Sequence, residues 1–541
     1  MAAEYTVGGA GANYANLEAL RTSGVLKDGD TIVLNRNDTS LLGAFTTNNL
    51  TFKGTGRILP AASVGFYSNT TANGIITLGT SMPNSDSLDF SSFTTSVIYA
   101  RTVNIVGGTN SFYDNTTPRG AISVQGSGAR VNISGGTNSF YDNSGGNGGA
   151  IYGGVNISGG TNSFSGNTVT GSGSGGAING AGDTIIITGG INTFTGNVAS
   201  GIWYGGDGWY DGAGGAISGT INITGGTNTF SDNIAYNVGG AISANGNSVF
   251  RATDGDFTFR GNRDGVGRSN EKANAIYVSG NSTLAAEEGR SIYFYDPVTT
   301  GTSTTSRTIT INPLESDTGK VVFDGSLYER AVDRHSAVYG NTTVDYGTMV
   351  MNGSVTYGAS NTVGGFTLNE WATLSTDDTT NRVQADTIRM YGTVDVAKGG
   401  TLELAARSGV YFDLDGTMNF GLDMNSSGYV DVLGNLTFGR GSTLSVSWDA
   451  NLDGLYDGWS NDYSLFGASG NVSGLTNLAL DMSFFDNEGY EGFSWDWNNS
   501  ILTLSYYGIG GGGDSSVPEP ATLVMLGLGL AGLGLARRQR R

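Results

Sequence analysis

The chain has 541 residues, and its 47 acidic residues against 27 lysines and arginines give a net charge of −20, so nucleic acid is not an expected partner. The absence of cysteine and the presence of one histidine, His335, exclude disulfides, cysteine nucleophiles and zinc sites that need two histidines. Its 90 glycines, with only 7 prolines, favour short strands joined by tight turns, and a hydrophobic content of 38% is enough for a long core.

Residues 1–50 predict an N-terminal cap followed by the first coils of an elongated β-structure, and residues 51–103 predict further irregular coils. A short amphipathic helix is expected over Leu17 and Leu20, then a strand from Thr31 to Leu34. This order resembles the entry to right-handed parallel β-helices of the pectate-lyase type, in which the helix covers the open end. The opening MAAEYTVGG has no basic or apolar run, so we expect that a signal peptide for the Sec export machinery has been removed.

Residues 104–276 contain a repeat in which two short motifs alternate. NISGGTNSFYDN at 132–143 shows the first motif, and GGAI at 148–151 shows the second. The phenylalanines at 112, 140, 164, 194, 230 and 259 are 24 to 36 residues apart, a period that fits one coil of a solenoid. Parallel stacking of such coils would align equivalent side chains into ladders. The ladder residues are Phe112, Asn115, Phe140, Asn143, Phe164, Asn167, Phe194, Asn197, Phe230 and Asn233.

The repeat predicts an all-β fold, a right-handed parallel β-helix. A functional alternative for the asparagines is a row of ligands, but asparagine ladders at such corners recur without any ligand. The alternation of Phe-x-x-Asn and Gly-Gly-Ala-Ile resembles the repeats of the chlamydial polymorphic membrane proteins. That resemblance implies the passenger architecture of an autotransporter-like surface protein with an adhesin role. The chain departs from that family at its C-terminus, where a sorting tail stands in place of the translocator.

Insertions in the repeat leave the coils at one edge. The spacing from Phe to the following Ala-Ile varies from 10 to 23 residues, whereas the spacing from Ile to the next Phe varies only from 13 to 18. Recognition loops usually leave a solenoid at such an edge. The longest insertion, at 198–213, offers the rings and acceptors of a sugar site: Trp203, Tyr204, Asp207, Trp209, Tyr210 and Asp211. Alternatively, these rings pack onto neighbouring coils and are simply buried.

Residues 277–507 predict further coils that resemble the later part of autotransporter passengers, with a hairpin at 493–507 as the closing cap. DANLDGLYDGWS at 449–460 partly matches a calcium loop, so calcium is the only candidate cofactor. Ser460 stands where that loop has a bidentate Glu, and no helices flank it, so an acidic turn is the alternative. The candidate ligands are Asp449, Asn451, Asp453 and Asp457.

The chain ends in a Gly-rich linker, residues 508–517, and a tail at 518–541. Residues 521–536 are uncharged, and as a helix they would cover roughly 24 Å, a marginal transmembrane span. The order of Pro-Glu-Pro, helix and arginines resembles the PEP-CTERM sorting signal of Gram-negative bacteria. That resemblance implies an exosortase-type enzyme as partner and a tail that anchors the chain transiently in the inner membrane. The residues that carry it are Pro518, Glu519, Pro520, Arg537, Arg538, Arg540 and Arg541.

These features predict an exported structural or adhesin-like protein of the cell envelope, outer surface or extracellular matrix. Its expected contacts are polysaccharide or the surface of a host or neighbouring cell. No catalytic residue is assigned, because His335 has no recognisable Ser and Asp partners and nothing orients Asp207 and Asp211. We therefore expect that the protein is not an enzyme. The alternative is a polysaccharide-active lyase or hydrolase on a pectate-lyase-like β-helix.

Overall fold

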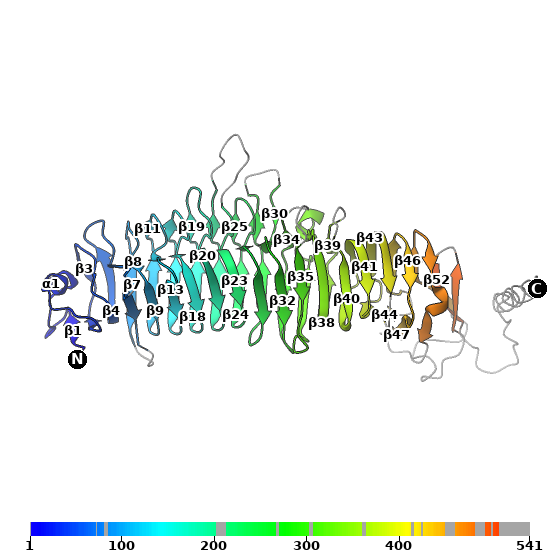
Figure 1. Cartoon of the computed structure of the whole chain (residues 1–541), viewed down its shortest axis with the longest axis horizontal. Helices are drawn as coiled ribbons and strands as arrows, with labels where there is room; N and C mark the ends of the chain where they lie inside the picture. The colour runs from blue at the N-terminus through cyan, green and yellow to red at the C-terminus, as the bar shows by residue number, and fades with distance from the viewer. Residues whose placement is uncertain are drawn as a thin grey trace, which may run out of the picture.

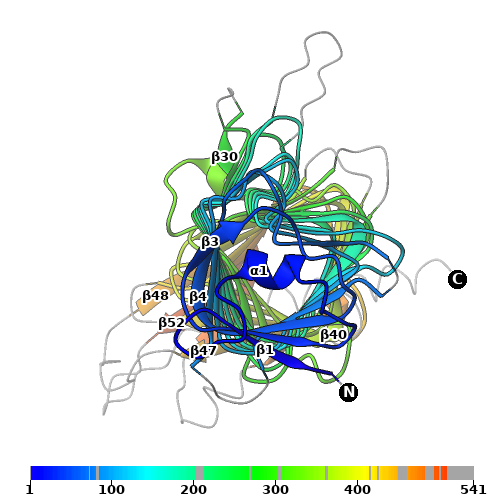
Figure 2. The same ribbon diagram turned by 90° about the vertical axis from the view of Figure 1, so that its left-hand side faces the viewer.

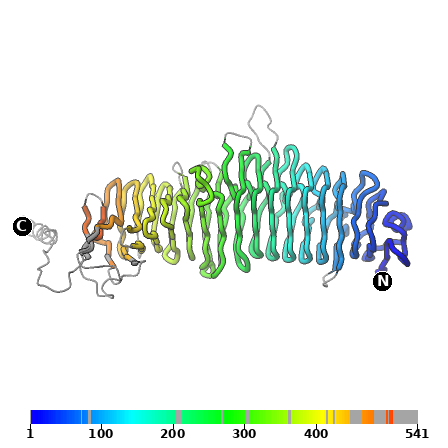
Figure 3. The backbone as a smooth tube through the Cα atoms, turned by 180° about the vertical axis from the view of Figure 1, so that it is seen from behind, coloured from blue at the N-terminus to red at the C-terminus, as the bar shows by residue number. Residues whose placement is uncertain are grey.

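The computed structural model of the chain is an all-β rod (Figure 1). Parallel strands pair from coil to coil, and 45 strands of the described part of the chain join one continuous sheet, an arrangement consistent with a β-helix. Figure 3 shows the backbone winding along the rod as successive coils. The structure describes residues 2–71, 73–80, 85–201, 212–266, 270–301, 307–359, 364–412, 416–422, 426–448, 460–481, 493–498 and 501–507.

Helix α1 (Leu17–Thr22) lies across the N-terminal end of the rod (Figure 2). The side chain of Asn16 caps it by accepting a hydrogen bond from the backbone N–H of Ala19 at 2.8 Å. Leu17 and Leu20 are fully buried, so the helix covers the core at the open end of the first coil. The predicted helix and the predicted strand Thr31–Leu34 are both confirmed. The first strands are β1 (Glu4–Val7), β2 (Thr31–Leu34), β3 (Asp38–Leu41) and β4 (Leu50–Pro60).

Three series of strands form the sides of the coils that follow. The strands that carry the repeated phenylalanines, and their equivalents, are β7 (Ser87–Ser91), β10 (Thr109–Tyr113), β14 (Thr137–Tyr141), β18 (Thr161–Ser165), β21 (Ile191–Thr195), β24 (Thr227–Ser231), β28 (Phe257–Arg260), β33 (Ser291–Phe294) and β36 (Lys320–Asp324). The second series precedes the corner that the Gly-Gly pair of NISGGTNSF and its equivalents form in each coil. Its strands are β6 (Ile75–Leu78), β9 (Thr102–Ile105), β13 (Arg130–Ile133), β17 (Gly154–Ile157), β20 (Ile178–Ile187), β23 (Ile217–Ile223), β27 (Ser248–Ala252), β32 (Ser282–Ala286) and β35 (Thr308–Ile311).

The third series follows the Gly-Gly-Ala segments, and a second, 7-stranded sheet lies beside it at the edge where the insertions leave. Strands β20 and β23 extend into the third series, whose other members are β5 (Tyr67–Asn69), β8 (Ile98–Ala100), β12 (Ile122–Val124), β16 (Ile151–Tyr152), β26 (Ile242–Ala244), β31 (Ile276–Val278) and β34 (Val298–Thr300). The small sheet comprises β11 (Thr116–Thr117), β15 (Ser144–Gly145), β19 (Thr168–Val169), β22 (Val198–Ala199), β25 (Ile234–Ala235), β29 (Arg263–Asp264) and β30 (Lys272–Ala273).

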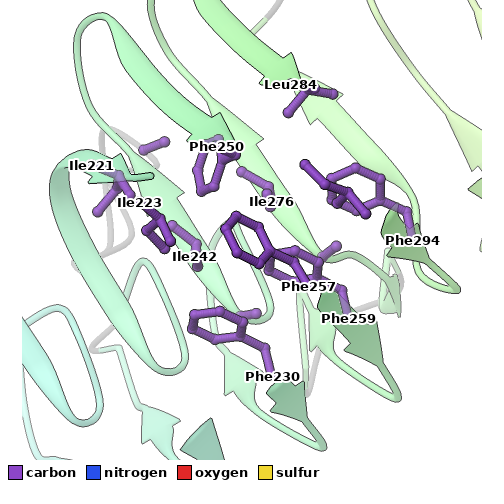
Figure 4. Close-up of a cluster of buried hydrophobic side chains, with 14 of the residues drawn as sticks. Ile221, Ile223, Phe230, Ile242, Phe250, Phe257, Phe259, Ile276, Leu284 and Phe294 are labelled. Atoms are coloured by element: carbon purple, nitrogen blue, oxygen red, sulfur yellow. The ribbon is translucent and has the colours of Figure 1, made fainter. Parts of the chain in front are cut away.

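Alternation along each strand decides which side chains enter the core. In β13, Val131 and Ile133 are buried whereas Asn132 is half-exposed, because successive side chains point to opposite faces of a strand. The coil turns sharply after such a strand, and at Gly160 the backbone has φ +82°. A Cβ there would lie 2.7 Å from the carbonyl oxygen of Gly136 in the preceding coil, so only glycine fits. Figure 4 shows the resulting core, with Phe230, Phe259 and Phe294 in one row beside aliphatic side chains.

Beyond residue 277 the coils continue the same sheet, since β26 pairs with β31 and β27 with β32. The later elements are η1 (Ala331–Arg334), β37 (His335–Ser336), β38 (Asn341–Asn352), β39 (Thr356–Gly358), β40 (Phe366–Thr376), β41 (Thr380–Met390), β42 (Thr393–Val396), β43 (Thr401–Phe412), β44 (Thr417–Leu422), β45 (Tyr429–Leu433), β46 (Leu436–Phe438), β47 (Thr443–Trp448), β48 (Ser460–Ala468), β49 (Val472–Ser473), η3 (Leu475–Asn477) and β50 (Ala479–Asp481). The predicted terminal hairpin is confirmed by the antiparallel pairing of β51 (Phe493–Asn498) with β52 (Ile501–Tyr507). The domain divisions stay predictions.

Candidate functional site

The repeated phenylalanines form a stacked column inside the rod. Phe164 is fully buried, and its ring lies 4.7 Å from the ring of Phe140 and 4.8 Å from that of Phe194, with interplanar angles of 3° and 4°. Phe112 and Phe230 extend the column in the same register. Parallel pairing in exact register produces this stacking, because each coil places its phenylalanine directly beside the previous one.

The repeated asparagines form a ladder in which the amides of Asn143, Asn167, Asn197 and Asn233 use their full hydrogen-bonding capacity. Asn167 donates from Nδ2 to the carbonyl oxygen of Phe140 at 2.8 Å and to Oδ1 of Asn197 at 2.9 Å. Its own Oδ1 accepts from the backbone N–H of Asn143 at 3.2 Å and from Nδ2 of Asn143 at 2.9 Å. Two donors and two acceptor sites are all that an amide offers. The asparagine is also fully buried, so the ladder is structural, with no amide group directed at a ligand.

The ladder ends at a buried carboxylate that the sequence analysis did not single out. Asn262 continues the chain of amides and donates from Nδ2 to Asp296 at 2.7 Å. Asp296 also accepts from the backbone N–H groups of Gly261 and Asn262 and from the hydroxyl of Tyr328. A carboxylate only accepts, so it terminates a row of donors. Burial raises the pKa of Asp296, and the hydrogen bonds donated to the carboxylate oppose that shift.

A second asparagine ladder, also missed, stabilises the corner that follows the Gly-Gly pair. Each of these side chains donates from Nδ2 to the carbonyl oxygen of a glycine in its own corner and, up to the last member, to Oδ1 of the next asparagine, at 2.9 to 3.1 Å. The signal was present in the sequence as the Thr-Asn or Ile-Asn pair that precedes the first five of the repeated phenylalanines. The residues are Asn110, Asn138, Asn162, Asn192 and Asn228.

Both ligand sites predicted from the sequence lie outside the residues that the structure describes. This is true of the aromatic insertion residues Trp203, Tyr204, Asp207, Trp209, Tyr210 and Asp211, and of the calcium candidates Asp449, Asn451, Asp453 and Asp457. The segment that leads to the insertion is described: β22 pairs with β19 and β25 in the small sheet. Among the described residues, no group of three or more His, Cys, Asp or Glu side chains is arranged to hold a metal ion.

His335 lies half-buried at the start of β37, with Nε2 donating to the carbonyl oxygen of Gly358 at 2.8 Å. Burial lowers the pKa of this imidazole, and the nearby charges of Lys272 and Arg382 act in the same direction, whereas the bond to Gly358 opposes them. The folded protein therefore holds the ring neutral more strongly than the unfolded chain does.

We expect stability to fall as the pH decreases through about 6.5, the ordinary pKa of histidine. Below that value the unfolded chain binds a proton that the folded chain still excludes, and the loss stops once the folded-state pKa is reached. Unfolding free energies between pH 5 and pH 8 should show this slope in the natural chain and lose it in His335→Gln. NMR of the single imidazole measures the pKa directly, and a value above about 6.5 would contradict the expectation.

A surface feature that the sequence analysis missed lies where β38, β40 and β41 turn a corner. A groove of about 540 Å³ opens there. Trp371 stands at its surface and is 68% exposed. We call this the corner groove, and the residues that line it include Asp345, Tyr346, Asn369, Glu370, Trp371 and Tyr391.

The comparisons with known proteins agree with both resemblances. Residues 516–541 match the PEP-CTERM protein-sorting motif, so the C-terminal tail is a sorting signal, which implies an exported protein processed by an exosortase. The chain is also 32% identical over 161 residues to the probable outer membrane protein pmp8 of Chlamydia pneumoniae, a match that covers 27% of this chain and 17% of that protein. The probable outer membrane proteins pmp2 and pmp7 of the same organism are each 32% identical, over 133 and 115 residues, covering 22% and 19% of this chain.

These matches are partial. The chain spans less than a fifth of the length of the curated relatives, at 17%, 16% and 12%. The predicted sorting-signal residues Pro518, Glu519 and Pro520 and the four terminal arginines fall within the matched motif. No helix within the described ranges is both long and apolar enough to cross a membrane, and residues 521–536, predicted as a membrane helix, lie outside those ranges.

Proposed function

We propose that this protein is an exported, non-catalytic element of the bacterial cell surface or extracellular matrix, with a structural or adhesin-like role. In this proposal the body is a right-handed β-helix, because nearly all crossovers between parallel strands are right-handed. The tail anchors this body transiently in the inner membrane until an exosortase removes the tail. The sorting motif at 516–541 is the observation that carries the proposal.

The rod itself supports a role in contact rather than in catalysis. Its coils present similar side chains again and again on one surface, as with Thr137, Thr161 and Thr227, which occupy equivalent exposed positions in three coils. Such repeated, shallow surfaces suit weak multivalent contact, because many low-affinity contacts on one scaffold add to a useful avidity. The similarity to proteins named as probable outer membrane proteins supports the surface location.

The tail provides the first test. In a bacterium that contains an exosortase, the natural chain should be found in the envelope or matrix fraction with the tail removed, whereas a chain lacking 516–541 should be lost from that fraction. Replacing the four terminal arginines with glutamine should block processing, since the positive charge holds that end in the cytoplasm. The matched lysine variant keeps the charge and should be processed normally. Unchanged fractionation of the truncated chain would overturn the proposal.

The polysaccharide-degrading alternative is tested on the same material. The purified chain is incubated with acidic and neutral polysaccharides, with and without calcium, and both retention and new chain ends are recorded. Retention without new ends agrees with the proposed role. New ends that disappear in Asp207→Asn or Asp211→Asn would make the protein an enzyme instead.

A further inference from the structure

The corner groove is built from one corner position on four successive coils. Pro313 lies two residues beyond Ile311, the last residue of β35, and Asp345 and Tyr346 occupy the corresponding bend within β38. In the next coil Tyr346 pairs with Trp371 of β40. Tyr391 follows β41, where its backbone N–H donates to the carbonyl oxygen of Leu368 at 2.8 Å. Because Leu368 pairs with Met390, Tyr391 lies opposite the bulge that contains Trp371. The three aromatic residues therefore come from successive coils about 4.8 Å apart and line the same groove.

A β-bulge explains why Trp371 is exposed. Val344 pairs with Leu368, but Tyr346 pairs with Trp371, so β40 has one residue more than β38 at this point. Bulges bend the strand and change the direction of the neighbouring side chains. As a result Trp371 is 68% exposed, whereas alternation places the next residue, Ala372, in the core.

Polar groups surround the three aromatic residues. Asn369 donates from Nδ2 to Oδ1 of Asp345 at 2.6 Å, which fixes the orientation of both side chains. Because a carboxylate accepts several hydrogen bonds and an amide can both donate and accept, the pair still has capacity for hydroxyl groups. Glu370 is exposed beside them. Of the described residues that line the groove, two are carboxylates and none is a lysine or arginine.

We propose that the corner groove binds a neutral polysaccharide, with its chain lying along the rod axis and its sugar rings stacked on Tyr346, Trp371 and Tyr391. Exposed aromatic rings bind the apolar faces of sugars, and the fixed Asn369 and Asp345 side chains bind their hydroxyl groups. Carboxylates in the groove and a net charge of −20 disfavour an acidic polymer.

This inference rests on the proposed function, since a matrix polysaccharide is met only by an exported protein. It is tested on the full chain in mild detergent, by native electrophoresis through gels that contain hydroxyethylcellulose, galactomannan or polygalacturonate. We expect at least one neutral polymer to retard the natural chain more than polygalacturonate does. Trp371→Ala should weaken that binding at least tenfold and Tyr391→Ala less strongly, because Trp371 offers the larger and more exposed ring.

Two controls separate binding from folding. Trp371→Ala should shift the melting temperature by less than about 2 °C, because substitution of an exposed side chain changes stability little. Tyr236→Ala removes another exposed ring, 36% accessible and at the insertion edge, and should bind as the natural chain does. Failure of both neutral polymers to retard the chain, equal retardation of Trp371→Ala, or stronger retardation by polygalacturonate would each overturn the inference. The fractionation assay of the tail is independent of these results.

Discussion

Replacing Phe164 with alanine is expected to lower the free energy of unfolding by about 3–5 kcal/mol, the usual cost of removing a buried phenylalanine ring. The ring is fully buried between two others at 4.7 and 4.8 Å, and the backbone register keeps those neighbours in place. The cavity therefore cannot close without breaking the pairing of β14, β18 and β21. Denaturant unfolding measures the total loss.

Hydrogen exchange locates the loss along the rod. The stability of a solenoid is close to a sum of terms for single coils and their interfaces, so protection should fall most in β14, β18 and β21 and least in β43. Phe164→Leu keeps most of the apolar volume and should cost clearly less. Ser163→Ala, at the neighbouring outward position, should change stability by less than about 0.5 kcal/mol. Equal losses in the alanine and leucine variants would contradict the importance of the stacked column.

Replacing Asn167 with alanine is expected to cost about 4 kcal/mol, because four buried groups each lose one hydrogen bond, at about 1 kcal/mol per bond. These groups are the backbone N–H and the side-chain amide of Asn143, the carbonyl oxygen of Phe140 and Oδ1 of Asn197. Asn167→Asp should be no better, since a carboxylate has no donor for the last two. The measurement is again the free energy of unfolding in denaturant.

Asn132 provides the matched control, because it also stacks on an asparagine of the neighbouring coil but does so at the surface. Its Nδ2 donates to Oδ1 of Asn104 at 3.0 Å, and the pair is only partly buried. Water replaces the lost partner there, so Asn132→Ala should cost less than about 1 kcal/mol. If the two alanine variants lost equal stability, the buried ladder would contribute no more than a surface contact.

Local patterns allowed several elements to be predicted from the sequence. The helix over Leu17 and Leu20 and the following strand Thr31–Leu34 were found because apolar spacing and a turn signal lie within a few residues of each other. The phenylalanine and asparagine ladders were predicted because the repeated motif shows which residues occupy equivalent positions in successive coils. The terminal hairpin was found from alternation within a single segment. In each case the information is local or periodic.

The corner groove was not predicted from the sequence, because its residues are neither close together in the sequence nor periodic. Tyr346, Trp371 and Tyr391 are 25 and 20 residues apart, in coils that no longer share a motif. A one-residue bulge in β40 decides which side chains align, and a shift of one residue exchanges the inner and outer faces of a strand. The sequence alone offered three unrelated aromatic residues, and no periodic signal connected them.

The sequence by itself determined that this protein is a stack of β-coils, with phenylalanines and asparagines in register and a sorting signal at its end, because repetition and short motifs carry that information. The tertiary structure alone decided how the repeat ends and what the surface offers. Asp296 closes the asparagine ladder because it lies where Asn262 needs an acceptor. Trp371 stands exposed because a bulge redirects it. Both outcomes depend on the pairing of residues in different coils, and that pairing is set by the length and register of every turn between them.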